Sequence, residues 1–363
     1  MARLRQDRLW RPARDIPFLV LSAAVVLSLI RSVDQPSVDV GIGGTSVSLV
    51  PADLALAALA AVSVHRLLGS GSLPRPARAV AYSAVAFSVW LLISSASNGF
   101  DATVGAAKLL EYGLLGLGIV LVVRRRGQLW LLVGLAAVRH AVTRRALTVT
   151  ALVLALVTAG VVGLRSGDLG SFLRWVGIQE KRAEVDAYGA SWSQRLIYAY
   201  IGGRMFVSSP IAGVGWYGTI PPKEYARYLP DAKERFPDQP ANYFPAADGE
   251  FIPQQTYDQV LYELGAVGAL LFLVLGALTA RTALDVGRRW PRGDPDELAA
   301  YLSVAWVAAL AGGLAGAALF GGIPFAAVFW LTLGVAALGP SLMPAHALAP
   351  ERVEPAELPA RAR

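Results

Sequence analysis

Long stretches that are almost free of charge constrain this chain more than any other feature. Several windows of 15–21 residues hold almost no Asp, Glu, Lys or Arg. A hydrocarbon core about 30 Å thick requires a helix of roughly 20 apolar residues, so these windows predict transmembrane helices. Composition agrees, because charged residues make up only 16% of the chain, against about 25% in soluble proteins. The predicted fold class is all-α, a polytopic membrane helix bundle.

The apolar windows predict about eight spans and one short segment that does not cross. The segment 129–138 is apolar for only ten residues and is bracketed by Arg residues, so it is too short to span. Lys108 and Glu111 lie inside one predicted span, three residues apart. They form either a functional pair or a charge pair that sets the depth of the helix. The spans are expected at 16–30, 49–65, 79–97, 104–123, 146–164, 265–284, 298–319 and 323–343.

Clusters of Arg residues predict the topology in the plasma membrane. Cytoplasmic loops carry excess Lys and Arg, and the clusters alternate with the spans only if 129–138 does not cross. Both termini are then cytoplasmic, and the bilayer is the first expected partner. The net charge of +7 comes from residues that flank spans, so it does not indicate nucleic acid. The expected parts are N-terminal membrane helices (1–164), an extracytoplasmic loop of short helices (165–263), C-terminal membrane helices (264–343) and a disordered cytoplasmic tail (344–363).

The first half of the loop predicts a helix over 190–207. Arg195 and Tyr198 are three residues apart and share a face of this helix. Arg204 follows Arg195 by nine residues, which places it about half a turn out of phase. A break at Gly202-Gly203 would let the two arginines converge.

A turn and a second helix complete the loop. Pro210 is expected to end the first helix, and Gly213 and Gly215 permit a tight turn before Trp216. Pro253 suits the first turn of the next helix, which is expected to enter the membrane near Gly265.

Two segments carry a resemblance to a known family. They are QRLIYAYIGGRMFVSSPIAGVGWYG (194–218) and PQQTYDQVLYELGAVGALLFL (253–273), and KLLEYGLLGLGIVLVVRRR (108–126) looks like an early span of the same family. Together they resemble the O-antigen ligase/polymerase family, bacterial envelope glycosyltransferases of GT-C type. The resemblance covers most of the chain.

The resemblance implies a membrane glycosyltransferase of cell-surface polysaccharide biosynthesis. It would transfer a glycan from an isoprenoid (undecaprenyl) diphosphate carrier to an acceptor hydroxyl on a glycan or lipid, without a metal or other cofactor. Arginine suits this role because its guanidinium donates two parallel hydrogen bonds to phosphate oxygens. The implied catalytic residues are Arg195, Arg204, Gln254 and Asp258. The implied substrate-binding residues are Tyr198, Gly213, Gly215, Trp216, Gln255 and Tyr257.

The chain departs from the family pattern where many members carry a His followed by Asn. Gln254 and Gln255 stand there, and a Gln side chain cannot take a proton. In the predicted topology no histidine lies outside, because all three are cytoplasmic: His65, His140 and His346. The nearby carboxylates are either the general base or solvated and capping acids: Asp248, Glu250 and Asp258.

The chain is also shorter than the family pattern between the Arg124-Arg125-Arg126 run and the loop, which suggests an internal deletion of spans. Two alternatives therefore stand beside the enzyme. One is a non-catalytic relative that binds lipid-linked glycan, and the other is a transporter, which would require charged or broken helices at mid-membrane. The sequence does not separate ligase from polymerase.

Overall fold

The computed structural model describes part of the chain. The described residues are 15–29, 35–42, 45–70, 73, 75–132, 187–218, 222–249, 251, 256–289 and 325–342. The spans predicted at 146–164 and 298–319, most of the short segment 129–138, and the predicted tail 344–363 lie outside them.

The described part is mostly helical. Four of its stretches are long and apolar enough to cross a membrane: Pro51–Gly69, Ala77–Ala96, Phe100–Val122 and Thr256–Arg289. Shorter apolar helices stand where the first and last spans are predicted, so a helical membrane protein is confirmed at this level. The helices are α2 (Ile16–Leu29), α3 (Pro51–Ser70), α4 (Arg75–Ala96), α5 (Phe100–Glu111), α6 (Gly113–Val122), α7 (Arg126–Leu132), α10 (Ala187–Ser208), α11 (Pro222–Tyr225), α12 (Leu229–Arg235), α13 (Thr256–Arg289) and α15 (Phe325–Leu342).

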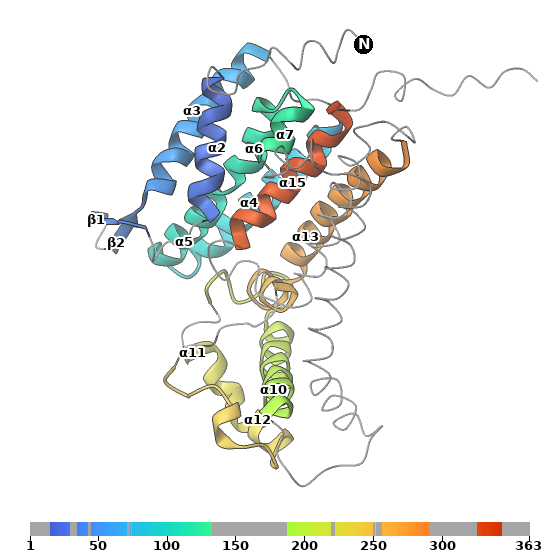
Figure 1. The fold of residues 1–363 in the computed structure, drawn as a ribbon. Coiled ribbons are helices and arrows are strands. Elements are labelled where there is room, and N and C mark those ends of the chain that lie inside the picture. The colour runs from blue at the N-terminus through green and yellow to red at the C-terminus, as the bar shows by residue number, and fades with distance from the viewer. Residues whose placement is uncertain are drawn as a thin grey trace, which may run out of the picture.

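A β-hairpin between the first two membrane helices corrects the all-α prediction. Strands β1 (Val38–Ile42) and β2 (Thr45–Leu49) pair antiparallel, with Val38 opposite Leu49 and Ile42 opposite Thr45. Val38, Val40 and Ile42 alternate with other residues, which is the period of a strand. The hairpin leads into α3 at one end of the bundle (Figure 1).

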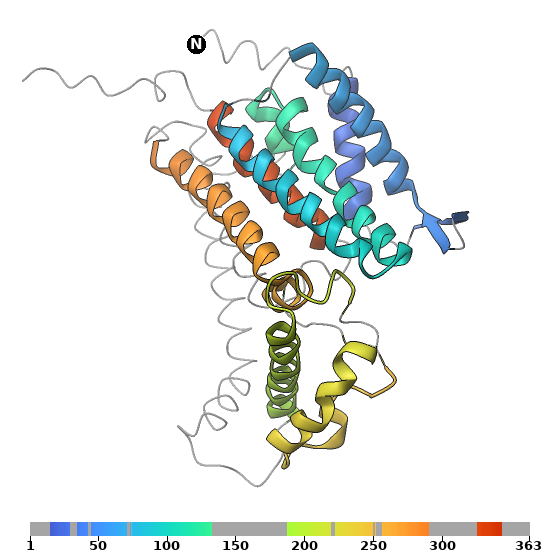
Figure 2. The same ribbon diagram turned by 180° about the vertical axis from the view of Figure 1, so that it is seen from behind.

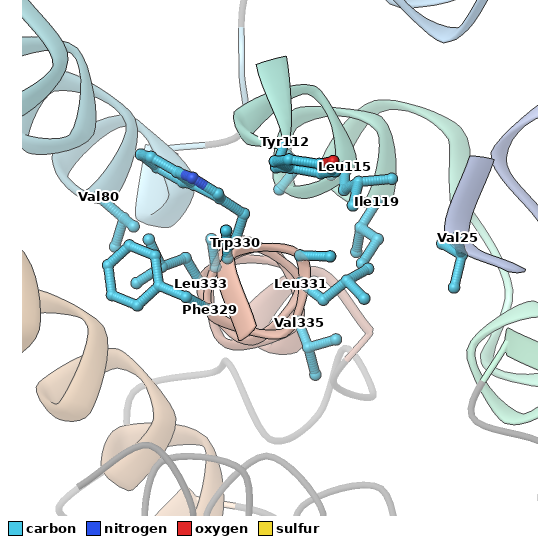
Figure 3. Close-up of a cluster of buried hydrophobic side chains, with 14 of the residues drawn as sticks. Val25, Val80, Tyr112, Leu115, Ile119, Phe329, Trp330, Leu331, Leu333 and Val335 are labelled. Atoms are coloured by element: carbon cyan, nitrogen blue, oxygen red, sulfur yellow. The ribbon is translucent and has the colours of Figure 1, made fainter. Parts of the chain in front are cut away.

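The membrane helices pack around α15. Figure 3 shows Phe329 and Trp330 of α15 reaching toward Val80 of α4, while Leu331 lies on the side of Ile119 from α6. All of these side chains are buried in one hydrophobic cluster. The described helices therefore share a dry interior rather than meeting only through lipid.

Glycines bring the backbones of α6 and α15 into contact. A Cβ atom at Gly116 would lie 2.7 Å from the carbonyl oxygen of Trp330, and one at Gly334 would lie 2.6 Å from Cα of Gly116. Small residues at a crossing of membrane helices allow this close approach, and van der Waals packing then holds the pair together. These two positions fix how α15 sits against α6.

Residues 187–251, here termed the loop subdomain, have a small core of their own. Figures 1 and 2 show α10, α11 and α12 gathered beyond one end of the bundle, with α13 running from the bundle to α10. A 3-10 turn, η3 (Ala226–Tyr228), joins α11 to α12, and a second, η4 (Ala241–Tyr243), follows α12. The core consists of buried side chains from α10, its neighbours and the end of the subdomain: Ile197, Ile201, Met205, Tyr225, Leu229, Ala232, Phe244 and Phe251.

Candidate functional site

Helix α10 carries Arg195, Tyr198 and Arg204, and it is one continuous helix. Ile197, Ile201 and Met205 recur at intervals of four and are fully buried in the core of the loop subdomain. Gly202 and Gly203 lie inside the helix, and α10 runs unbroken to Ser208. The predicted break at Gly202-Gly203 is therefore wrong, because buried apolar residues on both sides hold the helix together.

Arg204 does not join Arg195 at one site. Its Nη2 atom lies 2.8 Å from Oδ2 of Asp231 on α12, and both side chains are about half exposed, at 49% and 45%. Arg195 stands nine residues earlier, which places it on the opposite face of the helix, and its positive charge acts on Tyr257 of α13. The predicted convergence of Arg195 and Arg204 is corrected, since a continuous helix sends them to opposite sides.

The first segment of α13 crosses α10 at a glycine. A Cβ atom at Gly202 would overlap the ring of Tyr262, so only glycine lets this ring lie on the helix. The Tyr262 hydroxyl lies 3.1 Å from Oδ1 of Asp258 and 3.3 Å from the carbonyl oxygen of Ala199. The Tyr262 hydroxyl thereby holds Asp258 where the two helices meet.

A row of buried polar side chains marks the same segment of α13. Asp258 and Tyr257 are among the predicted site residues, whereas the Gln259–Glu263 pair was not predicted to belong to the site. Gln259 donates from Nε2 to Oε2 of Glu263 at 3.0 Å. Five polar residues among the first eight of this helix would be costly to bury without hydrogen-bond partners. The buried set is Thr256, Asp258, Gln259, Tyr262 and Glu263.

The predicted turn after Pro210 is present and requires its glycines. Gly213 and Gly215 have φ of 70° and 89°, in the left-handed region that glycine adopts without steric cost. The α10 helix ends at Ser208, two residues before Pro210, as predicted. Trp216 is fully buried against the bundle. In this structure it supports the turn, and its ring does not face an open site.

Helix α13 is broken at Gly265, and this break explains the turn. Gly265 has φ 65° and ψ −166°, so the segment before it ends and a new helix begins at Ala266. Each end leaves backbone groups without helical partners, and such groups are costly in an apolar region. At the beginning of the second helix, the N–H groups of Ala266 and Val267 donate to the carbonyl oxygens of Pro210 and Ile211 at 2.8 and 3.2 Å.

The carbonyl groups at the end of the first segment are satisfied in the same way. Val214 and Gly215 donate their N–H groups to the carbonyl oxygens of Tyr262 and Glu263 at 3.0 and 2.9 Å. Trp90 of α4 donates from Nε1 to the carbonyl oxygen of Leu264 at 3.1 Å. The four backbone hydrogen bonds between residues 210–215 and residues 262–267 form what we call the clasp, and the Trp90 bond supports it.

The end of α4 holds the turn from the other side. Asn98 donates from Nδ2 to the carbonyl oxygens of Val214 and Trp216 at 3.1 and 3.0 Å. Ser94 Oγ accepts from the Trp216 N–H at 3.1 Å. The loop subdomain and the bundle are therefore joined by hydrogen bonds to backbone groups, which side-chain substitutions in the turn would not remove.

Tyr217, the residue after Trp216, has a strained backbone. Its φ of 64° is unusual for a large side chain. Burial, together with the negative charge of Glu263, raises the pKa of the Tyr217 phenol above its ordinary value. The strained backbone of Tyr217 and the buried carboxylate of Glu263 both lie where the loop subdomain meets the bundle. Strained backbone conformations of this kind are common at functional sites.

The remaining predicted residues are placed as follows. Tyr198 packs its ring on Phe251 with centroids 5.1 Å apart, inside the loop subdomain. Tyr257 and Asp248 are both exposed. Gln254, Gln255 and Glu250 lie outside the described residues. In the part of the chain that the structure describes, no three His, Asp or Glu side chains gather as a metal site.

The ion pair of Lys108 that the structure shows is with Asp53, which in turn shares a side-chain hydrogen bond with the predicted partner Glu111. Lys108 Nζ lies 2.9 Å from Oδ2 of Asp53 on α3 and donates to the carbonyl oxygen of Ser48 on β2 at 2.6 Å. Lys108 is therefore used to fasten the hairpin and α3 to α5. The spacing of Lys108 and Glu111 along one helix could not predict Asp53 as a partner, because Asp53 lies on another helix.

Comparison with known proteins adds no relative to this picture. No protein-family model matches the chain, and no curated protein gives a significant match.

Proposed function

We propose that this protein is a membrane glycosyltransferase similar to O-antigen ligases, which transfers a glycan from an isoprenoid diphosphate to an acceptor hydroxyl. The observation that carries the proposal is the close packing of α10, the helix that bears Arg195, against the polar first segment of α13. This segment holds buried Asp258 and leads directly into a membrane helix. A substrate whose tail lies in the bilayer and whose diphosphate lies above it would bridge these two environments.

Arg195 is assigned to the diphosphate. A guanidinium fork donates two hydrogen bonds to phosphate oxygens, and negative charge grows on the diphosphate as it leaves. Arg204 is not included, because its guanidinium is paired with Asp231 on another side of α10. The assignment therefore differs from the expectation of two converging arginines.

Asp258 is assigned to the acceptor. In the proposed step the acceptor hydroxyl oxygen forms a bond to the anomeric carbon of the donor sugar. The bond from that carbon to the diphosphate oxygen breaks, and the diphosphate leaves with the electron pair. The hydroxyl proton passes to the carboxylate of Asp258, which Tyr262 holds in place by a hydrogen bond.

The test uses purified protein in lipid vesicles with an isoprenoid-diphosphate glycan and an acceptor glycan. The release of free isoprenoid diphosphate is measured. Arg195→Ala is expected to lower the rate by about 10²–10³-fold, the usual cost of losing a donor to a charge that develops in the transition state. Arg195→Lys should retain part of the rate, because an ammonium supplies charge without the fork.

The matched control is Arg204→Ala on the same helix. It removes only a half-exposed ion pair and is expected to leave the release rate near wild type. Equal losses in both variants would contradict the assignment of Arg195. Binding of the lipid-linked glycan without turnover in the wild type would favour the non-catalytic relative, and solute flux into the vesicles would favour a transporter.

A further inference from the structure

We infer that the edge of the loop subdomain formed by residues 207–212 is immersed in the lipid bilayer. This lipid-binding surface is separate from the proposed transfer reaction. It is inferred from exposed apolar residues, their attachment to a membrane helix, and the basic residues beside them.

The edge is apolar and uncovered. Val207 and Ile211 are 71% and 70% exposed. Val207 lies in the last turn of α10 and Ile211 in the turn that follows it, where the Gly213 N–H is bonded to the carbonyl oxygen of Ser209 at 2.9 Å. Pro210 and Ala212 beside them are also exposed. Leaving two large aliphatic side chains in water would forfeit their burial energy.

The edge is continuous with a surface that faces lipid. Ile211 is fastened through its carbonyl oxygen to the N–H of Val267, in the first turn of the membrane helix after Gly265. From this point, α13 presents an exposed apolar stripe that includes Leu270, Leu273 and Val274. In a helix long and apolar enough to cross a membrane, such a stripe faces hydrocarbon. The clasp thus holds Ile211 at the level where this stripe begins.

Basic side chains lie next to the apolar edge. Arg204 precedes Val207 by one turn of α10 and is paired with Asp231 at the surface. Arg227 donates from Nη2 to the hydroxyl oxygen of Ser208 at 3.3 Å and is paired with Glu224 at 3.2 Å. Elements that lie in the membrane interface combine large apolar residues with Lys or Arg that reach the phosphate groups. The continuity of the edge with the exposed apolar stripe of α13 favours lipid over a protein partner as the occupant.

The chain contains no cysteine, so single cysteines can be labelled without background. Val207→Cys and Ile211→Cys replace exposed side chains and leave the backbone hydrogen bond of Ile211 in place. Each introduced cysteine is labelled with a nitroxide spin label. The protein is reconstituted in vesicles of phosphatidylcholine with a minor fraction of phosphatidylglycerol. Collision with oxygen, which concentrates in hydrocarbon, is compared with collision with a water-soluble nickel complex.

Leu273→Cys on α13 gives the lipid reference, and Lys233→Cys on α12 gives the aqueous one. The oxygen-to-nickel ratio at 207 and 211 is expected to match position 273 and to exceed position 233 several-fold. A ratio equal to that at 233 would overturn the inference. Shielding from both reagents would overturn it too, because it would show that protein covers the edge. Neither outcome bears on glycan transfer, which is measured separately.

Discussion

Tyr262 lies on Gly202 so closely that no side chain fits between α13 and α10. The ring occupies the place where a Cβ atom at 202 would stand. The next residue, Gly203, has no atom within 4 Å of its own Cβ position. Two adjacent glycines therefore have different reasons to be glycine, and the pair offers a matched test of the crossing.

Gly202→Ala is expected to destabilise the protein by about 1–3 kcal/mol, because inserting a methyl group into a packed contact forces neighbouring groups to shift. Gly203→Ala should be neutral or stabilising by up to about 1 kcal/mol, since alanine is the better helix former. Thermal unfolding of both variants in detergent checks the difference. Equal stability of the two variants would show that the crossing is looser than described.

The broken helix predicts a second pair of glycine variants. Gly265→Ala would place a Cβ on a backbone with φ 65° and onto the carbonyl oxygen of Ile211. Gly276→Ala in the same helix meets nothing within 4 Å. Gly265→Ala is therefore expected to lower the yield of folded protein and the unfolding temperature, whereas Gly276→Ala should lower neither. Size-exclusion chromatography in detergent and thermal unfolding measure both.

Asn98 supports the turn with two hydrogen bonds to backbone carbonyl groups. Asn98→Ala leaves the carbonyl oxygens of Val214 and Trp216 without these donors, and the expected cost is about 1–3 kcal/mol. Ser88→Ala, in the preceding helix α4, removes a hydroxyl that donates to the carbonyl oxygen of Ala84, so it is the control. Hydrogen exchange of residues 213–216 should accelerate in Asn98→Ala alone.

The Lys108–Asp53 pair predicts a non-additive result. Asp53 is nearly buried while Lys108 is about a third exposed, at 9% and 34%. Lys108→Met leaves the carboxylate without this partner, at a cost of about 1–3 kcal/mol, below that of a fully buried pair because water screens the lysine. Adding Asp53→Asn should recover part of the loss. A double variant whose stability is the sum of the two single losses would contradict direct coupling.

Local chemistry made parts of this structure predictable. Pro210, Gly213 and Gly215 act through their own backbone preferences, so the end of α10 and the turn followed from the sequence. The apolar windows located membrane helices for the same reason, because length and polarity decide a span. The β-hairpin was overlooked although the sequence contains a signal for it, a Gly-Gly pair at 43–44 between two alternating segments.

Contacts between distant residues could not be predicted in this way. Asp231, the partner of Arg204, lies 27 positions away, and Asp53 lies 55 positions from Lys108. The spacing of Arg195 and Arg204 alone places them on opposite faces of a helix, and the structure keeps them there because α10 is unbroken. The buried Gln259–Glu263 pair was not predicted, since burial depends on what packs against the helix.

The hydrogen bonds from Trp90 and Asn98 have a mechanical consequence. Because Trp90 lies in α4 and Asn98 follows its last residue by two positions, a change in the tilt of α4 within the bilayer would turn the clasp, and with it α10, as a rigid lever. Helices adjust their tilt to the thickness of the surrounding membrane. Acyl-chain length in the host membrane would thereby set the orientation of the loop subdomain, without any ligand binding to it.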